Sequence, residues 1–315
     1  MKDKKFIRRA LMLAARGGRA VSPNPMVGAV IVKNDRIIGE GWHKKFGGSH
    51  AEANAIRSVR HTQDLSGATL YVTLEPCQHW GKTPPCTEAI EKVGIKRVVA
   101  GSHDPFQKRI TNYELPITFL KESIAQQCQE LNKFFFTWVT KKRPYITAKI
   151  AVSADGFVAG LKGKPVRITN KVQDRLVHQL RAQHQAIMVG VNTVIADDPL
   201  LTVRHAKGAD PLRVILDSKL RIPRNARVLK DKNYIIATTQ RHSRVLCHSR
   251  ENGNLDPRLR GDDNVWISPT QKQVNLKKLL AHLAKQGISS VLVEPGPTLY
   301  ASLKKAGLID ELIIL

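Results

Sequence analysis

The chain has 315 residues, a length that predicts two domains, each large enough to bury its own core. Hydrophobic residues make up 42% and charged residues 24%, which excludes collagen-like, low-complexity and acidic-tail proteins. Lys and Arg number 51 against 26 Asp and Glu, and the net charge of +25 favours anionic partners: nucleic acid, acidic membranes or phosphorylated metabolites. Because the basic residues are spread along the chain, we expect a generally basic surface and not a dedicated nucleic-acid patch.

The sequence shows no sign of a membrane span or an export signal. No run approaches the ~18 apolar residues that cross a bilayer, and Lys and Arg interrupt the N-terminus where a signal peptide needs an apolar core. We therefore expect a cytoplasmic protein with no membrane partner. The cysteines are too few and too irregular for a disulfide framework, which directs attention to metal binding or catalysis: Cys77, Cys86, Cys128 and Cys247.

The first part of the chain, residues 1–143, predicts an α/β domain with helices covering one sheet. In chain order the sequence predicts a helix over 4–16, a hairpin over 27–41 that turns at Asn34-Asp35, a helix over 50–60, a strand over 69–73, a helix over 87–93 and a strand over 96–100. Beyond residue 102 the pattern weakens. We place the domain boundary at the basic run before Pro144.

A second series of alternating elements predicts another α/β domain over residues 144–315. Its expected elements are a strand over 145–152, a helix over 171–182, strands over 186–189, 212–216 and 234–238, a helix over 276–285, a strand over 290–293 and a helix over 299–306. The segment 242–264 is rich in Arg, Asn, Gly and Asp, so we expect a surface insertion there.

The first domain carries residue types that suit a catalytic zinc site. His50, Cys77 and Cys86 offer three ligands for tetrahedral Zn²⁺, which leaves one position open for chemistry. In zinc-dependent nucleobase deaminases, H-x-E supplies one ligand and the proton carrier, and P-C…C supplies two thiolates. Glu52 holds the carrier's place, where it would move a proton from the attacking water to the departing ammonia. We therefore predict Zn²⁺ as a cofactor and Glu52 as the catalytic residue.

The length of the loop between Cys77 and Cys86 distinguishes among the classes of zinc-dependent deaminase. Nucleoside, tRNA and polynucleotide deaminases typically show P-C-x-x-C, whereas eight residues separate Cys77 from Cys86. With Pro23–Gly28 and His50-Ala51-Glu52, the run Thr73–Cys86 resembles the bifunctional deaminase/reductase family of riboflavin biosynthesis. The resemblance implies a cytidine-deaminase-like fold and deamination of 2,5-diamino-6-(5-phosphoribosylamino)pyrimidin-4(3H)-one, a phosphorylated pyrimidine, to 5-amino-6-(5-phosphoribosylamino)uracil. It implies substrate contacts at Asn24, His43, His79 and Lys82.

Two motifs extend the resemblance into the second domain, Asn192–Arg204 and Val293–Leu299, and no Rossmann glycine fingerprint accompanies a strand. The resemblance implies a fold similar to dihydrofolate reductase and NADPH as the cofactor that reduces the ribosyl group to ribityl. It places the substrate sugar phosphate at Leu201, Arg204 and Glu294. It places NADPH at a larger set: Ala151, Thr193, Asp197, Ser218, Gly296, Pro297, Thr298, Leu299, Tyr300, Ala301 and Ser302.

The sequence departs from the family pattern in three places. Phe106-Gln107 stands where the family has an Asn-Pro and Gly-containing stretch, and Pro165 and Arg167 replace the usual Ser and Trp. The chain also ends at Leu315 inside a predicted strand, so we expect a C-terminally truncated reductase domain. The two departures in the second domain lead to the hypothesis that the reductase is impaired. The resemblance further implies a homo-oligomer.

Two alternatives stay open. A tRNA or nucleoside deaminase with an appended domain is favoured by the positive charge, but the long cysteine loop and the reductase motifs oppose it, so we expect no nucleic-acid partner. A non-catalytic relative that keeps a structural zinc is opposed by Glu52, which such a zinc would not need.

Overall fold

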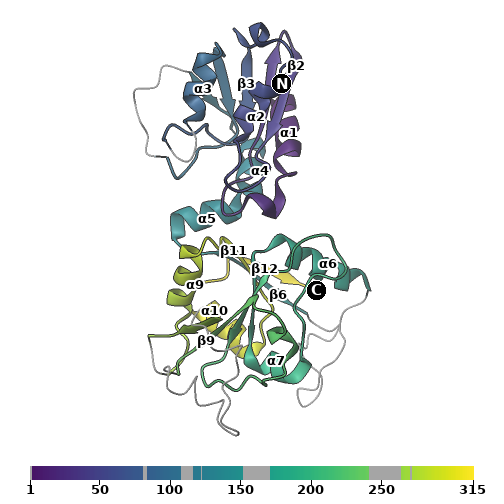
Figure 1. Cartoon of the computed structure of the whole chain (residues 1–315), viewed down its shortest axis with the longest axis vertical. Helices are drawn as coiled ribbons and strands as arrows, with labels where there is room; N and C mark the ends of the chain where they lie inside the picture. The colour runs from purple at the N-terminus through teal and green to yellow at the C-terminus, as the bar shows by residue number, and fades with distance from the viewer. Residues whose placement is uncertain are drawn as a thin grey trace. The chain divides into compact units, whose positions relative to one another are not determined.

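The computed structural model of the protein describes residues 2–80, 84–107, 116–121, 123–151, 171–240, 264–269 and 272–315. These residues form two compact units, Met1–Lys141 and Lys142–Leu315 (Figure 1). No helix in the described part is long and apolar enough to cross a membrane. Four residues singled out in the sequence lie outside the described ranges, together with nearly all of the expected insertion: Lys82, Pro165, Arg167 and Cys247.

The N-terminal unit is built on a five-stranded sheet in the order β2-β1-β3-β4-β5. Strand β1 pairs antiparallel with β2 and β3, whereas β4 pairs in parallel with β3 and β5. The strands are β1 (Gly28–Lys33), β2 (Arg36–Trp42), β3 (Thr69–Val72), β4 (Arg97–Ala100) and β5 (Ile117–Phe119). The helices are α1 (Lys2–Ala14), α2 (Ala51–Ser58), α3 (Cys86–Lys92), α4 (Ser123–Leu131) and α5 (Lys133–Lys141), with short 3₁₀ turns at Gly18–Val21 and Thr62–Leu65.

The hairpin β1–β2 shows how the sequence places helices on both faces of this sheet. Asn34 and Asp35 both have positive φ, 50° and 59°, as expected for a tight turn that matches the strand twist, so the predicted hairpin is confirmed. Side chains then alternate across the sheet. Ala29 and Ile31 join the core that includes α2 and α3, while Val30 joins the core that includes α1 and α4. The sheet therefore lies between two helical layers.

Gly41 on β2 lets helix α2 lie directly against the sheet. A Cβ added at Gly41 would lie 2.3 Å from the Ala55 backbone nitrogen and 2.4 Å from the Ala51 carbonyl oxygen. Both are backbone atoms of the helix, so no side-chain rotation could relieve the clash. A larger residue at Gly41 would have to displace α2.

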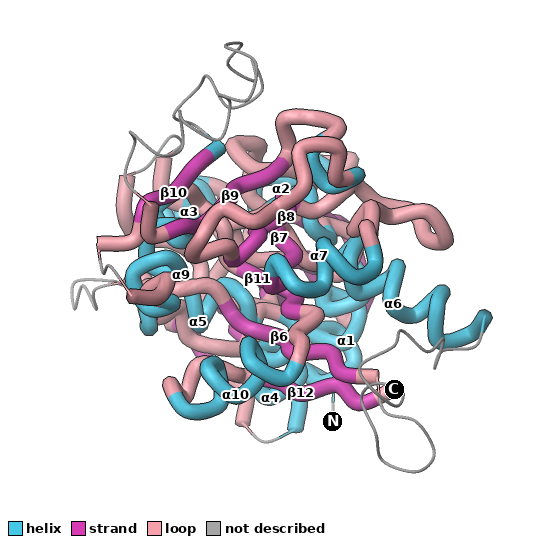
Figure 2. The backbone as a smooth tube through the Cα atoms, turned by 90° about the horizontal axis from the view of Figure 1, so that it is seen from below, coloured by secondary structure: helices cyan, strands magenta, loops and turns pink. Residues whose placement is uncertain are grey.

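The C-terminal unit is built on a seven-stranded sheet in the order β10-β9-β8-β7-β11-β6-β12, with every neighbouring pair parallel. Its strands are β6 (Tyr145–Ile150), β7 (Ala186–Gly190), β8 (Leu212–Leu216), β9 (Tyr234–Thr238), β10 (Val265–Ile267), β11 (Ser290–Val293) and β12 (Glu311–Ile314) (Figure 2). Its helices are α6 (Lys171–Gln183), α7 (Val191–Asp197), α9 (Leu276–Lys285) and α10 (Pro297–Lys305), with a 3₁₀ turn at Arg227–Leu229.

Helices cover both faces of this sheet as well. Met188 of β7 packs in the core with α9 and α10, whereas its neighbours Ile187 and Val189 pack in the core with α6 and α7. Parallel strands buried on both faces are continuous apolar runs, which is why β8, β9 and β11 begin and end where the sequence predicted them. The predicted α/β class is confirmed in both units. Five elements were not predicted: β5, α4, α5, α7 and β10.

Candidate active sites

Three candidate metal ligands meet in the N-terminal unit. His50 caps the start of α2, Cys77 follows β3, and Cys86 begins α3. One donor atom from each residue lies within 4.8 Å of the other two, and His50 Nδ1 is 3.2 Å from Cys86 Sγ and 3.4 Å from Cys77 Sγ. One imidazole and two thiolates form a donor set that suits catalytic zinc, because a fourth position stays open. The residues present therefore fit a zinc ion.

Hydrogen bonds inside this cluster favour a thiolate at Cys77. The Cys86 backbone N–H donates to Cys77 Sγ at 3.3 Å. Hydrogen bonding from Cys86 and from His50 lowers the pKa of the Cys77 thiol well below its ordinary value. The thiolate is the form of cysteine that binds metals, so the lowered pKa of Cys77 favours binding of a metal cation at this cluster.

Glu52 lies in the first turn of α2 and is buried beside the cysteines. Burial raises the pKa of its carboxyl to about 7, and the negative charge of Cys77 adds to the rise. A carboxyl with a pKa near neutrality can both accept and release a proton at physiological pH, as a general acid–base residue must.

A cavity of about 260 Å³ opens beside Glu52, and Asn24, His43 and His79 line it. His43 Nδ1 lies 3.0 Å from the Ser49 carbonyl oxygen and Nε2 lies 3.3 Å from Asn24 Nδ2. With the proton on Nδ1, the ring donates to Ser49 and accepts from Asn24. Burial lowers the pKa of His43, which favours this neutral ring. The fourth expected substrate residue, Lys82, is among those outside the described ranges.

The same cavity has walls that the sequence analysis did not identify. Helix α5 contributes Phe135 and Trp138, and the segment after β4 contributes Asp104 and Phe106. The Phe106 ring contacts the His79 ring at a centroid distance of 5.5 Å. The aromatic run in α5 was the available signal, but in the sequence it lay in the weakly patterned stretch before the domain boundary.

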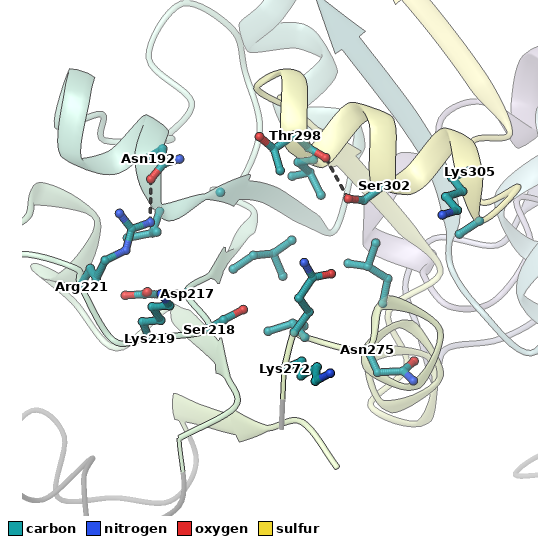
Figure 3. Close-up of a pocket in the computed structure, with 18 of the residues that line it drawn as sticks. Asn192, Asp217, Ser218, Lys219, Arg221, Lys272, Asn275, Thr298, Ser302 and Lys305 are labelled. Atoms are coloured by element: carbon teal, nitrogen blue, oxygen red, sulfur yellow. Dashed lines mark hydrogen bonds between the residues drawn. The ribbon is translucent and has the colours of Figure 1, made fainter. Parts of the chain in front are cut away.

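The C-terminal unit contains a larger cavity, of about 820 Å³, whose wall includes Ser218, Thr298, Leu299 and Ser302 from the expected NADPH set (Figure 3). Basic side chains also line it: Lys219, Arg221, Lys272, Lys277 and Lys305. Helix α10 has Gly296 at its N-cap and Pro297, which has no N–H, at its first position, so Thr298 and Leu299 in the cavity wall carry the first backbone N–H groups of the helix. A cavity of this size and charge fits a phosphate-bearing cofactor such as NADPH.

The other residues expected to bind the cofactor are not among those that line this cavity. Thr193 faces Gly296, since a Cβ added at Gly296 would lie 4.0 Å from Thr193 Oγ1. Asp197 ends α7 and Ala151 follows β6. The remaining expected residues belong to α10 and are not part of the described cavity wall: Pro297, Tyr300 and Ala301.

A buried ionic cluster surrounds Glu294, which follows β11. Arg181 Nε lies 2.9 Å from one carboxylate oxygen of Glu294, and Lys149 Nζ lies 3.7 Å from the other. Burial would raise the pKa of Glu294, but Arg181 and Lys149 outweigh it and hold the pKa below its ordinary value. The sequence does not reveal Arg181 as a site residue, because a single arginine in a predicted helix gives no signal of a partner 113 positions away.

The segment after α7 brings the remaining expected substrate residues close to Arg181. The Arg204 backbone N–H donates to His178 Nδ1 at 3.0 Å, and its guanidinium donates to Thr202 Oγ1 at 3.0 Å. Arg181 also donates to the Thr202 carbonyl oxygen, at 3.3 Å. Leu201 is buried with a φ of 56°, a left-handed conformation that is strained for leucine and typical of functional segments.

Comparisons with known proteins match both units. The family model of the cytidine and deoxycytidylate deaminase zinc-binding region matches residues 1–102, and that of the RibD C-terminal domain matches residues 144–315. The riboflavin biosynthesis protein RibD of Actinobacillus pleuropneumoniae is 39% identical over 99% of this chain and 82% of its own length. RibD of Escherichia coli K12 is 37% identical over 100% of this chain and 87% of its own length.

Solved structures agree over the full chain. A diaminohydroxyphosphoribosylaminopyrimidine deaminase/5-amino-6-(5-phosphoribosylamino)uracil reductase from Thermotoga maritima gives a TM-score of 0.81 at 37% identity, covering 97% of this chain and 84% of that one. RibD of Acinetobacter baumannii gives 0.83 at 36% identity, covering 99% and 86%. These matches span both units, so a tRNA deaminase and a non-catalytic zinc protein are not favoured. The chain belongs to the RibD family of bifunctional deaminase/reductases of riboflavin biosynthesis.

Proposed function

We propose that the N-terminal unit deaminates 2,5-diamino-6-(5-phosphoribosylamino)pyrimidin-4(3H)-one and that the C-terminal unit reduces the resulting 5-amino-6-(5-phosphoribosylamino)uracil with NADPH. Membership of the RibD family supports both steps. The observation that carries the proposal is the convergence of His50, Cys77 and Cys86 with buried Glu52 beside a cavity of about 260 Å³.

In the deaminase step, His50, Cys77 and Cys86 would hold zinc, which would acidify a water molecule so that hydroxide is available near neutral pH. Glu52 accepts a proton from the water that attacks C2 of the pyrimidine and returns it to the amino group that leaves as ammonia. Burial raises the pKa of its carboxyl, which favours the protonated form that the second transfer needs. The family's H-x-E and P-C…C motifs support these roles.

Substrate orientation is assigned to the polar residues of the cavity. His43 Nε2 accepts from Asn24 Nδ2 at 3.3 Å, which fixes the Asn24 carboxamide and leaves its oxygen and second N–H for the pyrimidine, while contact with His43 itself is proposed on the resemblance. His79 lies on the same wall. Lys82 is proposed for the phosphate on the resemblance alone, because a lysine is a compact point charge that suits a phosphate.

In the reductase step, NADPH supplies the hydride when it is bound in the basic cavity of about 820 Å³. Thr298 and Ser302 of α10, with Ser218, would contact the cofactor there. Arg204 is exposed and suits the sugar phosphate, and Leu201 and Glu294 lie on elements that Arg181 connects. The same resemblance assigns Ala151, Thr193 and Asp197 to the cofactor.

Three further proposals rest on the sequence and on the family resemblance. They are a homo-oligomer, a cytoplasmic location and functional domains over 1–143 and 144–315. Impairment of the reductase stays a prediction that rests on Pro165 and Arg167.

The test is a product analysis by mass spectrometry after the full chain receives the diaminopyrimidine ribosyl phosphate, Zn²⁺ and NADPH together. The ribityl-aminouracil phosphate is the product expected if both units act, and its formation would overturn the predicted impairment. Accumulation of the unreduced aminouracil would limit the activity to the N-terminal unit. No conversion at all would contradict the proposed deaminase.

A further inference from the structure

Both the nitrogen and the oxygen of the Gln107 carboxamide bind the loop that carries Cys77. Its Nε2 donates to the Glu75 carbonyl oxygen at 3.2 Å and to the Pro76 carbonyl oxygen at 3.0 Å. Its Oε1 accepts the Gln78 backbone N–H at 3.0 Å. A flipped amide would face its oxygen toward two carbonyl oxygens, so only one orientation satisfies the three contacts.

These hydrogen bonds involve the backbone directly before Cys77 and directly after it. The Glu75 backbone N–H donates to the Ser102 carbonyl oxygen at 2.9 Å, and Thr87 Oγ1 donates to the Cys77 carbonyl oxygen at 3.1 Å. Gln107 supplies the partners for the carbonyl of Pro76 and for the N–H after Cys77. No strand among the described residues pairs with this loop, and one side chain provides hydrogen bonds of the kind that a neighbouring strand would give.

The same turn builds part of the cavity wall. The Gln107 backbone N–H donates to the Asp104 carbonyl oxygen at 3.2 Å, and the Asp104 backbone N–H donates to the Glu75 carboxylate at 3.1 Å. Asp104 and Phe106 both line the cavity. Gln107 therefore joins the segment that holds a thiolate to the segment that holds two wall residues.

We infer that Gln107 is a positioning residue for the zinc site. Its carboxamide fixes the backbone of residues 75–78 so that Cys77 Sγ meets His50 and Cys86 at the observed separations. The inference rests on the proposed function, in which these residues hold zinc. Groups that hold metal ligands in place typically contribute 10–100-fold to metal affinity.

The test measures zinc affinity of the full chain by competition with a chromophoric chelator. Gln107→Met keeps the side-chain length and removes the three hydrogen bonds, so we expect a 10–100-fold loss of zinc affinity. The absorption of the Co²⁺-loaded chain provides a second readout, since its thiolate-to-metal bands follow the geometry of the Cys77 ligand and should shift. Gln129→Met is the matched control, because Gln129 is exposed on α4, and it should bind zinc like the unchanged chain.

Zinc affinity within twofold of the unchanged chain, with an unaltered Co²⁺ spectrum, would overturn the inference. If Gln107→Met does not fold, Gln107→Asn decides, because it keeps the amide one methylene shorter: lower zinc affinity supports the inference and unchanged affinity overturns it. Cys77→Ala in the same assay separates the two proposals. Zinc affinity unchanged by Cys77→Ala would contradict the metal site itself, whereas a loss there with none in Gln107→Met contradicts only the role of Gln107.

Discussion

The two units reach their chemistry by different means. In the N-terminal unit three ligands and Glu52 come from α2, α3 and the end of β3, and their side chains alone define the reaction. In the C-terminal unit the expected cofactor cavity is lined by Ser, Thr, Asn, Gln, Asp, Lys, Arg and apolar residues, types that are common anywhere in proteins. A metal site can therefore be predicted from residue type and spacing, whereas a dinucleotide cavity is recognised only from the fold or from related proteins.

The strongest way to separate the units is to remove one zinc ligand. Cys77→Ala should lower deaminase turnover by about 10³-fold or more, because several kcal/mol of transition-state stabilisation depend on the metal. Reductase turnover on the unreduced aminouracil phosphate should be unchanged in the same preparation. Loss of both activities would show that the units are not chemically independent.

The second test removes the proton carrier and leaves the ligands in place. Glu52→Gln should lower deaminase turnover by about 10²–10⁴-fold with the zinc content unchanged. Glu91→Gln, an exposed carboxylate of α3, is the control and should keep full activity. A fully active Glu52→Gln chain would require another group to move the proton.

The corresponding change in the C-terminal unit is Arg181→Met, which keeps the Lys149 ion pair with Glu294 and removes the Arg181 one. Removing one partner of a largely buried ion pair should cost about 3 kcal/mol of unfolding free energy in that unit and raise KM for the reductase substrate. Urea unfolding and reductase kinetics would measure these effects, with exposed Arg175→Met as the control. We expect Arg181→Met to leave deaminase turnover unchanged, which would show that the ionic cluster at Glu294 serves the C-terminal unit and not the deaminase.

The smallest expected effect is acid sensitivity in the C-terminal unit. Burial, then the positive charges of Arg181, Arg204 and His205, lower the pKa of His178 to about 4 against a weaker opposing effect of Glu294. The unfolded chain takes up this proton near pH 6.5, before the folded chain does. Stability from the neutral ring is therefore complete above about pH 6.5 and falls as the pH drops toward 4.

His178→Asn tests this expectation, because its side-chain oxygen can still accept the Arg204 N–H. Between pH 7 and pH 5 the unchanged chain should lose about 1–2 kcal/mol of unfolding free energy through His178, and the variant should lose less by that amount. His205→Asn, at the exposed neighbouring ring, should keep most of the acid sensitivity. Equal pH slopes in all three chains would exclude His178 as the source.

Much of the fold was predictable because the parallel strands are buried on both faces. The expected strand over 212–216 and the expected helix over 276–285 match β8 and α9 residue for residue. Helix α7 was missed because it starts directly after β7 with no turn residues other than Gly190, its N-cap. Helix α5 was missed because its aromatic residues pack on Leu74, a contact that no periodicity in the sequence reveals.

The candidate sites divide in the same way. The meeting of His50, Cys77 and Cys86 with Glu52 was expected from motif spacing, since each motif lies at a strand end or a helix start. Arg181 was not expected, because its partner Glu294 follows a strand that is 113 positions away in the sequence. Phe106-Gln107 was noticed only as a departure from the family pattern, and its contacts to the 75–78 backbone needed three-dimensional structure.

The close approach of α2 to Gly41 matters for anyone who wishes to redesign the deaminase. The helix carries Glu52 and is capped by His50, yet a glycine on a neighbouring strand sets how near it lies. Variant libraries confined to the His-Ala-Glu and Pro-Cys motifs would leave that spacing untouched. A redesign of the pocket for a larger or smaller heterocycle should therefore also vary β2. One methyl group added at Gly41 would displace α2, and Glu52 would move with the helix.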